Sequence, residues 1–244
     1  MIKGILIDFG GTIDSDGVHW FDAFREGYSV VADIPKDLLY EAYVYTERTL
    51  GRNPIITPDY SFCKTLQTKI VLQTQYLNSK GILLTKQDTI LDYCYNKVVR
   101  HIETVSKPVL EKLSRKYPMV LVTNFYGNMH TVLDEFGLSH LFKDVIESAV
   151  VGIRKPDPEI FRLGVKALGL EPQETIMIGD SLEKDILPAQ SIGCQTFCLR
   201  RTPGAQKGRF FLCPYCETLR ELSSLLSGHK KNRPFCAPIP TGSF

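Results

Sequence analysis

Short runs of apolar, often β-branched residues recur along the sequence, and segments with helical periodicity lie between most of them. The runs are Gly4–Asp8, Met119–Asn124, Asp144–Ser148, Thr175–Gly179 and Gln195–Leu199. Runs of this kind predict strands that are buried on both faces. Their alternation with helices predicts an α/β fold in which helices cover a parallel sheet.

The helices predicted between these strands end where the sequence offers glycine. They cover Lys107–Tyr117, Met129–Phe136 and Pro158–Leu168. Gly137 and Gly169 directly follow the last two helices, as expected for left-handed residues that end helices.

The alternation stops between residues 15 and 104, where helical periodicity continues without a strong strand signal. The helices expected there cover Val18–Val31, Pro35–Leu50, Tyr60–Lys80 and Lys86–Glu103. Prolines between them, such as Pro54 and Pro58, fit helix boundaries. We therefore expect a four-helix module inserted after the first strand. A single helical layer packed on the sheet is the alternative.

The pattern weakens after Leu199. Residues 210–213 can form a short last strand, Glu217–Leu226 can form a closing helix, and Ser227–Phe244 has the composition of a tail. The predicted organisation is a core made of residues 1–15 and 105–227, a helical module at 16–104 and a tail at 228–244.

Composition narrows the class of protein. Among 244 residues, 43% are hydrophobic and 23% charged, which is typical of a soluble globular enzyme. The net charge of +2 gives no bulk field that would attract nucleic acid or acidic lipid. Neither a signal peptide nor a membrane-spanning run is recognisable. We therefore expect a cytoplasmic protein with neither nucleic acid nor membrane as a partner, and with its seven cysteines reduced.

The first predicted strand ends in a carboxylate. Asp8 is followed by Gly10 and Gly11, which let the backbone turn closely around a ligand. In a wound parallel sheet, ligands bind beyond the carboxyl ends of the strands. Asp8 is therefore a candidate functional residue, although an aspartate at this place can also simply cap a loop.

Further polar residues are expected at the same edge of the sheet. They are Thr123, Asn124, Lys155, Asp180 and Asp185. Carboxylates that converge in a half-buried site repel one another and lose hydration, so they need a cation. Carboxylate oxygens, completed by water and phosphate, are the usual environment of Mg2+. The sequence therefore predicts Mg2+ as a cofactor.

Taken together, these residues resemble the four ordered motifs of the haloacid dehalogenase-like superfamily. The motifs are Asp8 with Thr12, then Thr123, then Lys155, and finally Asp180 with Asp185. The match runs through residues 4–200, and the helical insert resembles the cap of the phosphoglycolate-phosphatase-like branch. The resemblance implies a doubly wound, Rossmann-like α/β core with a mobile helical cap.

The resemblance also implies a role for each matching residue in the hydrolysis of a small phosphorylated molecule. Asp8 would be the nucleophile, Lys155 would stabilise charge and orient Asp8, and Thr123 would bind phosphoryl oxygens. Mg2+ would be held by Asp8, the backbone carbonyl of Gly10, Asp180 and Asp185. The implied substrate-binding residues are Gly10, Gly11, Thr12 and Asn124, of which Asn124 can instead cap the following helix.

The sequence departs from the family at Gly10. Phosphatases of the family carry a second aspartate there, which acts as general acid and then as general base. Such catalysis contributes roughly 10²–10⁴-fold. The nearest candidates for a replacement are Asp14, Asp16 and His19. Glycine still offers a backbone carbonyl, so the implied metal site is retained.

Three functions remain open on these grounds. The first is a phosphatase that works without the usual acid. The second is a phosphonatase-like hydrolase of C–P bonds, which would need a lysine from the helical module to form a Schiff base. The third is a non-catalytic module that binds a phosphorylated ligand. The lysines available for a Schiff base are Lys36, Lys64, Lys69 and Lys80.

Two weaker patterns have structural explanations. Cys213 and Cys216, with His229 and Cys236, suggest a zinc site or a redox pair, but the spacing to the last two is irregular and Cys213 falls in a predicted strand, so we expect a structural role. The run from Tyr40 to Tyr45 is typical of either core packing or an aromatic substrate wall. The sequence does not indicate an oligomeric state.

Overall fold

The predicted strands form one parallel sheet. The computed structural model describes residues 1–199, 215–216 and 218–221. Strand order is β3-β2-β1-β4-β5-β6, and every neighbouring pair is parallel. The strands are β1 Gly4–Ile7, β2 Met119–Thr123, β3 Asp144–Glu147, β4 Thr175–Gly179, β5 Gln195–Leu199 and β6 Tyr215–Cys216. The first three are one residue shorter than predicted, so Asp8 follows β1 directly.

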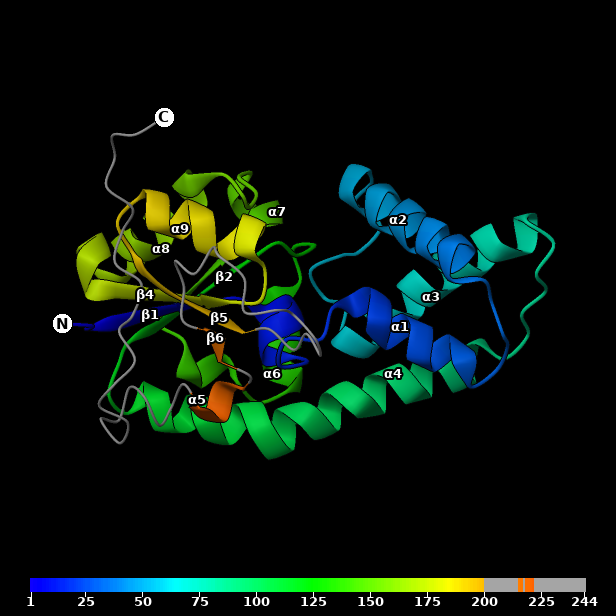
Figure 1. Cartoon of the computed structure of the whole chain (residues 1–244), viewed down its shortest axis with the longest axis horizontal. Coiled ribbons are helices and arrows are strands. Elements are labelled where there is room, and N and C mark those ends of the chain that lie inside the picture. Colours follow the sequence, from blue (N-terminus) through cyan, green and yellow to red (C-terminus); the bar gives the residue numbers. More distant parts are fainter. Residues whose placement is uncertain (200–214, 217, 222–244) are drawn as a thin grey trace.

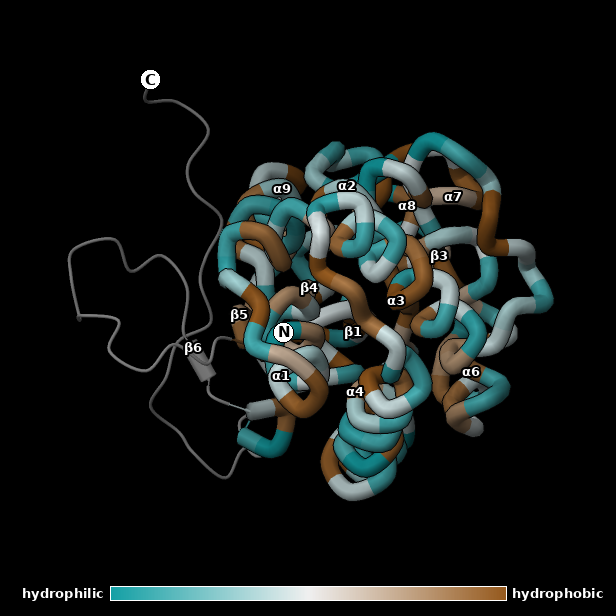
Figure 2. Tube along the Cα trace, turned by 90° about the vertical axis from the view of Figure 1, so that its right-hand side faces the viewer, coloured by the Kyte–Doolittle hydropathy of each residue, from teal (hydrophilic) through white to brown (hydrophobic). Residues whose placement is uncertain are grey.

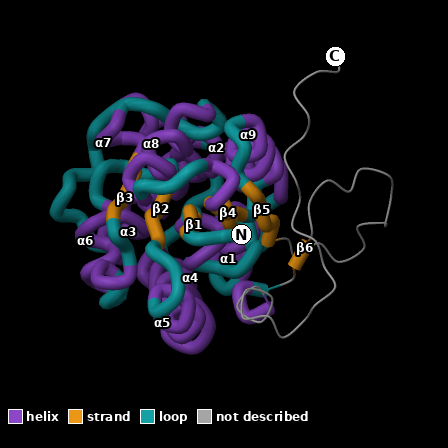
Figure 3. The backbone as a smooth tube through the Cα atoms, turned by 90° about the vertical axis from the view of Figure 1, so that its left-hand side faces the viewer, coloured by secondary structure: helices purple, strands orange, loops and turns teal. Residues whose placement is uncertain are grey.

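Successive residues of the central strands point to opposite faces of the sheet. On one face, Ile5 and Ile7 pack with residues of α5 and α6, whereas Leu6 packs on the other face with residues of α8. Figures 1 and 3 show α8 and α9 on one side of the sheet and α5 on the other. The predicted doubly wound α/β fold is confirmed.

Helices cover the sheet and also form the inserted module. Their bounds are α1 Trp20–Ser29, α2 Lys36–Arg52, α3 Phe62–Ser79, α4 Gln87–His101, α5 Lys107–Ser114, α6 Met129–Glu135, α7 Ser148–Val151, α8 Pro158–Leu168 and α9 Leu187–Ser191. Short helical turns are η1 Phe9–Ile13, η2 Ile102–Ser106, η3 Ser139–Leu141, η4 Pro172–Glu174 and η5 Leu182–Ile186. The predicted helix at 107–117 ends three residues early, and Gly137 and Gly169 are left-handed as expected.

The helical module, α1 to α4, lies beside the sheet (Figure 1). Within it, α2 packs on α3, α3 on α4, and α1 on α4. Figure 2 faces this module and shows hydrophobic and hydrophilic residues alternating along its helices, as packing of amphipathic helices requires. The chain runs from α4 through η2 into α5 without leaving the helix, so the predicted boundary at 104–105 falls within a helical segment.

The C-terminal predictions are only partly covered. The strand predicted at 210–213 and the tail at 228–244 lie outside the described residues, as do Cys213, His229 and Cys236. Of the helix predicted at 217–226, residues 219–221 are described and helical. Among the described residues, no helix is both long and apolar enough to cross a membrane.

Candidate active site

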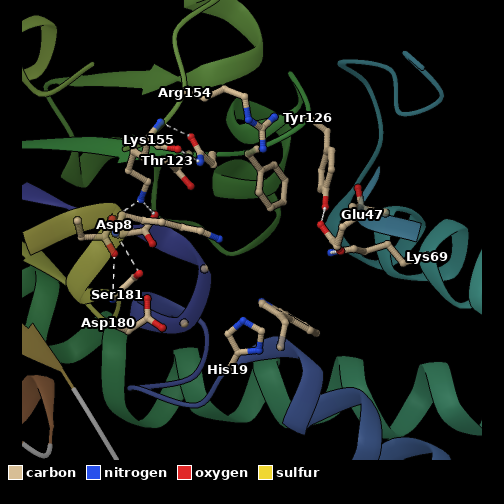
Figure 4. A pocket seen from close by; sticks show the side chains of 18 of the residues that line it. Asp8, His19, Glu47, Lys69, Thr123, Tyr126, Arg154, Lys155, Asp180 and Ser181 are labelled. Carbon is tan, nitrogen blue, oxygen red and sulfur yellow. Dashed lines mark hydrogen bonds and ion pairs between the residues drawn. The ribbon is translucent and has the colours of Figure 1, made fainter. Parts of the chain in front are cut away.

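The carboxyl ends of the three central strands meet around Asp8. Because β1 lies between β2 and β4, Asp8 is flanked by Thr123 at the end of β2 and by Asp180 after β4. Figure 4 shows these side chains turned towards one cavity. The sheet order therefore brings the predicted strand-end residues together.

Lys155 joins two of the carboxylates. Its Nζ lies 2.8 Å from Asp8 Oδ1 and 2.6 Å from Asp185 Oδ1, and no more than 8% of any of the three side chains is exposed. Burial by itself would lower the pKa of Lys155, but the adjacent carboxylates of Asp185 and Asp8 raise it above its ordinary value. The ammonium therefore stays protonated and fixes the orientation of Asp8.

Asn124 holds the backbone of Lys155 in place. The Asn124 Oδ1 accepts a hydrogen bond from Lys155 N at 2.9 Å, and Asn124 Nδ2 donates to Lys155 O at 3.0 Å. The side chain also lines the cavity, but its amide bonds the lysine loop, and Asn128 occupies the position before α6. Asn124 therefore positions Lys155. The sequence had predicted either substrate binding or capping of the following helix for this residue.

The three aspartates form an oxygen-lined cluster. One carboxylate oxygen from each of Asp8, Asp180 and Asp185 lies within 4.8 Å of the others. Burial and the neighbouring Asp8 raise the pKa of Asp180 to about 8, and burial raises the pKa of Asp185 above its ordinary value. The carboxylates therefore compete for positive charge beyond that of Lys155, and hard oxygen ligands of this kind fit Mg2+.

Two glycines permit this close approach. Gly11 has a φ of +83°, and a Cβ there would lie 2.4 Å from Asp180 Oδ2. A Cβ on Gly179 would lie 2.5 Å from the Cβ of Asp185. Larger residues at either position would therefore push the carboxylates apart.

Gly10 differs from Gly11. Its φ of −74° and ψ of 120° suit any residue, and nothing lies within 4 Å of a Cβ built there. Gly10 and Gly11 both line the cavity, whereas Thr12 is fully buried and is not part of the lining. An aspartate would therefore fit at position 10.

Asp14 and Asp16 are poorly placed to replace the missing acid. Asp14 accepts hydrogen bonds from Gly11 N at 2.7 Å and from Trp20 Nε1 at 2.6 Å, and burial raises its pKa to about 7. Asp16 Oδ1 accepts from Leu219 N at 2.8 Å. Neither residue belongs to the cavity lining, because the turn after Asp8 directs both side chains elsewhere.

His19 does line the cavity. Its Nδ1 accepts a hydrogen bond from Phe21 N at 3.1 Å at the start of α1, so the neutral ring carries its proton on Nε2. Burial, together with the nearby Lys184, lowers the pKa of His19. The ring is therefore a neutral hydrogen-bond donor rather than a ready source of a proton.

The cavity has a volume of about 200 Å3 and lies between the core and the helical module. Its lining includes three residues that were not singled out from the sequence as a group: Glu47 and Lys69 from the helical module, and Tyr126 from the loop after β2 of the core. Lys69 falls at the same helical spacing as the buried Leu66 and Ile70, and a lysine on such an apolar face is the one local signal that marks it.

Of the lysines and tyrosines of the helical module that the sequence offered as candidates, only some line the cavity. Lys36, Lys64 and Lys80 are exposed, whereas Lys69 is buried and lines the cavity. In the tyrosine run, Tyr43 lines the cavity and Tyr40 is 51% exposed. The aromatic-wall interpretation therefore applies to Tyr43 alone.

Curated relatives match parts of the chain. It is 39% identical over 69 residues to glyceraldehyde 3-phosphate phosphatase of Methanopyrus kandleri, covering 28% of this chain and 30% of the relative. It is 34% identical over 101 residues to phosphoglycolate phosphatase of Aliivibrio fischeri, covering 41% and 44%. The chain thus spans less than half the length of either relative.

A solved structure and a family model match most of the chain. The magnesium-bound HAD-hydrolase YfnB of Bacillus subtilis aligns with 92% of this chain and 98% of its own, with a TM-score of 0.57 and 21% identity, which shows the fold alone. The model of the haloacid dehalogenase-like hydrolases matches residues 2–193, as the strand-end motifs led us to expect. The chain belongs to the haloacid dehalogenase-like hydrolase family.

Proposed function

We propose that the chain is a Mg2+-dependent phosphatase that hydrolyses a small phosphate ester through an aspartyl-phosphate on Asp8. The observation that carries the proposal is the bridge from Lys155 to Asp8 and Asp185 within the cavity. A carboxylate that is oriented, charge-balanced and open to a cavity is suited to nucleophilic attack. Family membership and the phosphatase names of the partial relatives support the same reaction.

In the proposed reaction, an oxygen of Asp8 attacks phosphorus and the ester P–O bond breaks, so that the alcohol leaves with its electron pair. Lys155 stabilises negative charge on the phosphoryl oxygens, and Thr123 and the amide groups after Asp8 donate hydrogen bonds to them. Water then attacks phosphorus, releasing phosphate and restoring the Asp8 carboxylate. Asp8, Asp180, Asp185 and the backbone carbonyl of Gly10 would hold Mg2+, which would supply charge compensation for the phosphoryl group.

The leaving oxygen needs a proton, and among the described residues that line the cavity neither Gly10 nor His19 is an ordinary donor. Gly10 has no side chain, and the capping bond of His19 to Phe21 N keeps Nδ1 unprotonated. A neutral imidazole gives up a proton poorly, although its Nε2 hydrogen can donate a hydrogen bond. We therefore infer that, among substrates that bind equally well, those with acidic leaving groups, such as aryl or acyl phosphates, react faster than simple alkyl phosphates.

The position of Lys69 favours a phosphonatase-like alternative, because this lysine of the helical module lines the cavity. A Schiff base requires a neutral amine. Burial would lower the pKa of Lys69, but the carboxylate of Glu47 raises it above the ordinary value. An ammonium held in this way is a poor nucleophile, so phosphate ester hydrolysis is the better-supported function.

The test is a screen of phosphate esters and phosphonoacetaldehyde, with Mg2+ present or removed by a chelator. We expect Mg2+-dependent phosphate release from esters and none from the phosphonate. Release from the phosphonate alone, with borohydride trapping at Lys69, would establish the alternative. Tight ligand binding without any release would identify a non-catalytic module.

A further inference from the structure

Glu47, Lys69 and Tyr126 form a polar cluster across the cavity from Asp8 (Figure 4). Lys69 Nζ lies 2.8 Å from Glu47 Oε1, and the Tyr126 hydroxyl donates to Glu47 Oε2 at 2.7 Å. Glu47 comes from α2 and Lys69 from α3, whereas Tyr126 comes from the core. The cluster therefore joins the two sides of the cavity.

Protein stability alone gives a weak reason for this cluster. The Lys69 side chain is 9% exposed, and burial of an ion pair has a desolvation cost that offsets much of its attraction. The ammonium also lies 5.7 Å from the ring centre of Trp20 and 5.3 Å from that of Tyr126. A charged donor and acceptor surrounded by aromatic faces at a cavity wall are suited to holding a ligand.

The charges in the cavity limit what that ligand can be. Lys155 and the divalent cation of the proposed function would together balance Asp8, Asp180 and Asp185, and Glu47 balances Lys69. The further cations of the lining are Arg154 and Lys184, both exposed, so water screens their charge. Among the described lining residues, no buried cation is left for a second anionic group.

The paired charges still have hydrogen-bonding capacity. Lys69 has three N–H donors, of which Glu47 takes one, and a carboxylate accepts several bonds. Ligand hydroxyl groups can bond to the remaining donors of Lys69 and acceptor sites of Glu47 without breaking the ion pair. A carboxylate or an ammonium on the ligand would instead compete for one member of the pair. The cavity, of about 200 Å3, has room for the phosphoryl group together with a small alcohol.

We propose that Glu47, Lys69 and Tyr126 bind the hydroxyl groups of an uncharged leaving group, which makes the substrate the phosphate ester of a small polyol or sugar. The proposal rests on the proposed function in that the phosphate lies at Asp8. Tyr43 and Trp20, which also line the cavity, then face the carbon skeleton of the alcohol. Recognition comes from the ion pair as a unit and not from a single charge.

The experiment measures binding in the Asp8→Asn variant, so its result does not depend on turnover. Propyl phosphate, glycerol 3-phosphate and 3-phosphoglycerate share a three-carbon chain and differ in hydroxyl groups and charge. Calorimetry with Mg2+ present should show glycerol 3-phosphate binding at least about tenfold more tightly than either of the others, as expected for a hydrogen bond to a charged group. Equal binding of propyl phosphate, or tighter binding of 3-phosphoglycerate, would overturn the proposal.

Two further changes, made in the same background, test the ion pair itself. Glu47→Gln leaves Lys69 uncompensated and should shift preference from glycerol 3-phosphate to 3-phosphoglycerate. Replacing both residues, Glu47→Gln with Lys69→Met, should abolish the preference for glycerol 3-phosphate over propyl phosphate. The matched control is Lys64→Met, on the same helix but exposed, which should change nothing. Unaltered preference in a folded Glu47→Gln protein would contradict the proposal.

Failure of the proposed function gives a different result. Wild-type protein that releases no phosphate from any ester, while Asp8→Asn still prefers glycerol 3-phosphate, would refute the phosphatase and retain the binding specificity. Wild-type protein that hydrolyses all three esters equally well, with equal binding, would refute the specificity and retain the phosphatase.

Discussion

Lys155 contacts Asp8 and Asp185 at once, with Nζ 2.8 Å from the first carboxylate and 2.6 Å from the second. Removing one member of a buried ion pair leaves an uncompensated charge. We therefore expect Lys155→Met to lower the free energy of unfolding by about 3–5 kcal/mol without Mg2+. Urea unfolding measures this loss, with the exposed Lys166→Met as control. A loss below about 1 kcal/mol, in the range of ordinary surface substitutions, would show that the bridge is not formed.

Metal addition should stabilise the protein through the aspartate cluster. At a Mg2+ concentration about 100-fold above its Kd, the free energy of unfolding should rise by about 2.7 kcal/mol. Asp180→Asn should lose most of this gain because it removes one of the three clustered carboxylates. Asp144→Asn, an exposed carboxylate at the start of β3, is the matched control. If Mg2+ raised the free energy of unfolding equally in both variants, the cation would not bind at the aspartate cluster.

Gly10→Asp should supply the missing acid, since the backbone at Gly10 suits any residue and space for a Cβ is open. We expect kcat/KM for alkyl phosphates to rise by up to roughly 10²–10⁴-fold, with a smaller gain for aryl phosphates. Gly10→Asn has the same size without an acidic proton and should not show this gain. A wild-type rate that is independent of leaving-group pKa, while chemistry is rate-limiting, would mean that another residue already acts as the acid.

His19 should make stability depend on pH. Its pKa in the folded protein is below the ordinary 6.5, mainly through burial, so the unfolded chain binds a proton more readily. The stability contributed by neutral His19 is complete above pH 6.5 and is lost as the pH falls from 6.5 through the folded pKa. His19→Asn keeps a capping group without titrating.

The measurement is the free energy of unfolding of wild-type protein and of His19→Asn at pH values above and below 6.5. As the pH falls, wild-type protein should lose stability relative to His19→Asn, by about 1 kcal/mol if the helix cap is lost. A difference that stays constant across this range would show that His19 does not titrate as described.

Much of the site was predictable because parallel strands bring their carboxyl ends to one edge of a sheet. Asp8, Thr123 and Asp180 each end or follow a central strand, so their proximity follows from the strand assignment alone. Asp14 shows the limit of this reasoning. It is close to Asp8 in sequence, but hydrogen bonds from Gly11 N and Trp20 Nε1 hold its side chain away from the cavity.

The module side of the cavity was harder to predict. Helical periodicity indicates which face of a helix is apolar, but not which face of another helix it meets. Glu47 and Lys69 are 22 positions apart on different helices, and Tyr126 comes from the core, so only tertiary packing brings them together. For the same reason, four lysines were equal candidates in the sequence, and the fold separates Lys69 from the rest.

The most direct test of the central claim is acid-quench mass spectrometry of the protein during turnover of an aryl phosphate with Mg2+. We expect one added phosphoryl group on the peptide that contains Asp8, formed in the first turnover and absent from Asp8→Asn, which should also lose activity while remaining folded. Steady turnover without phosphoryl transfer to that peptide, together with substantial activity in Asp8→Asn, would show that Asp8 is not the nucleophile.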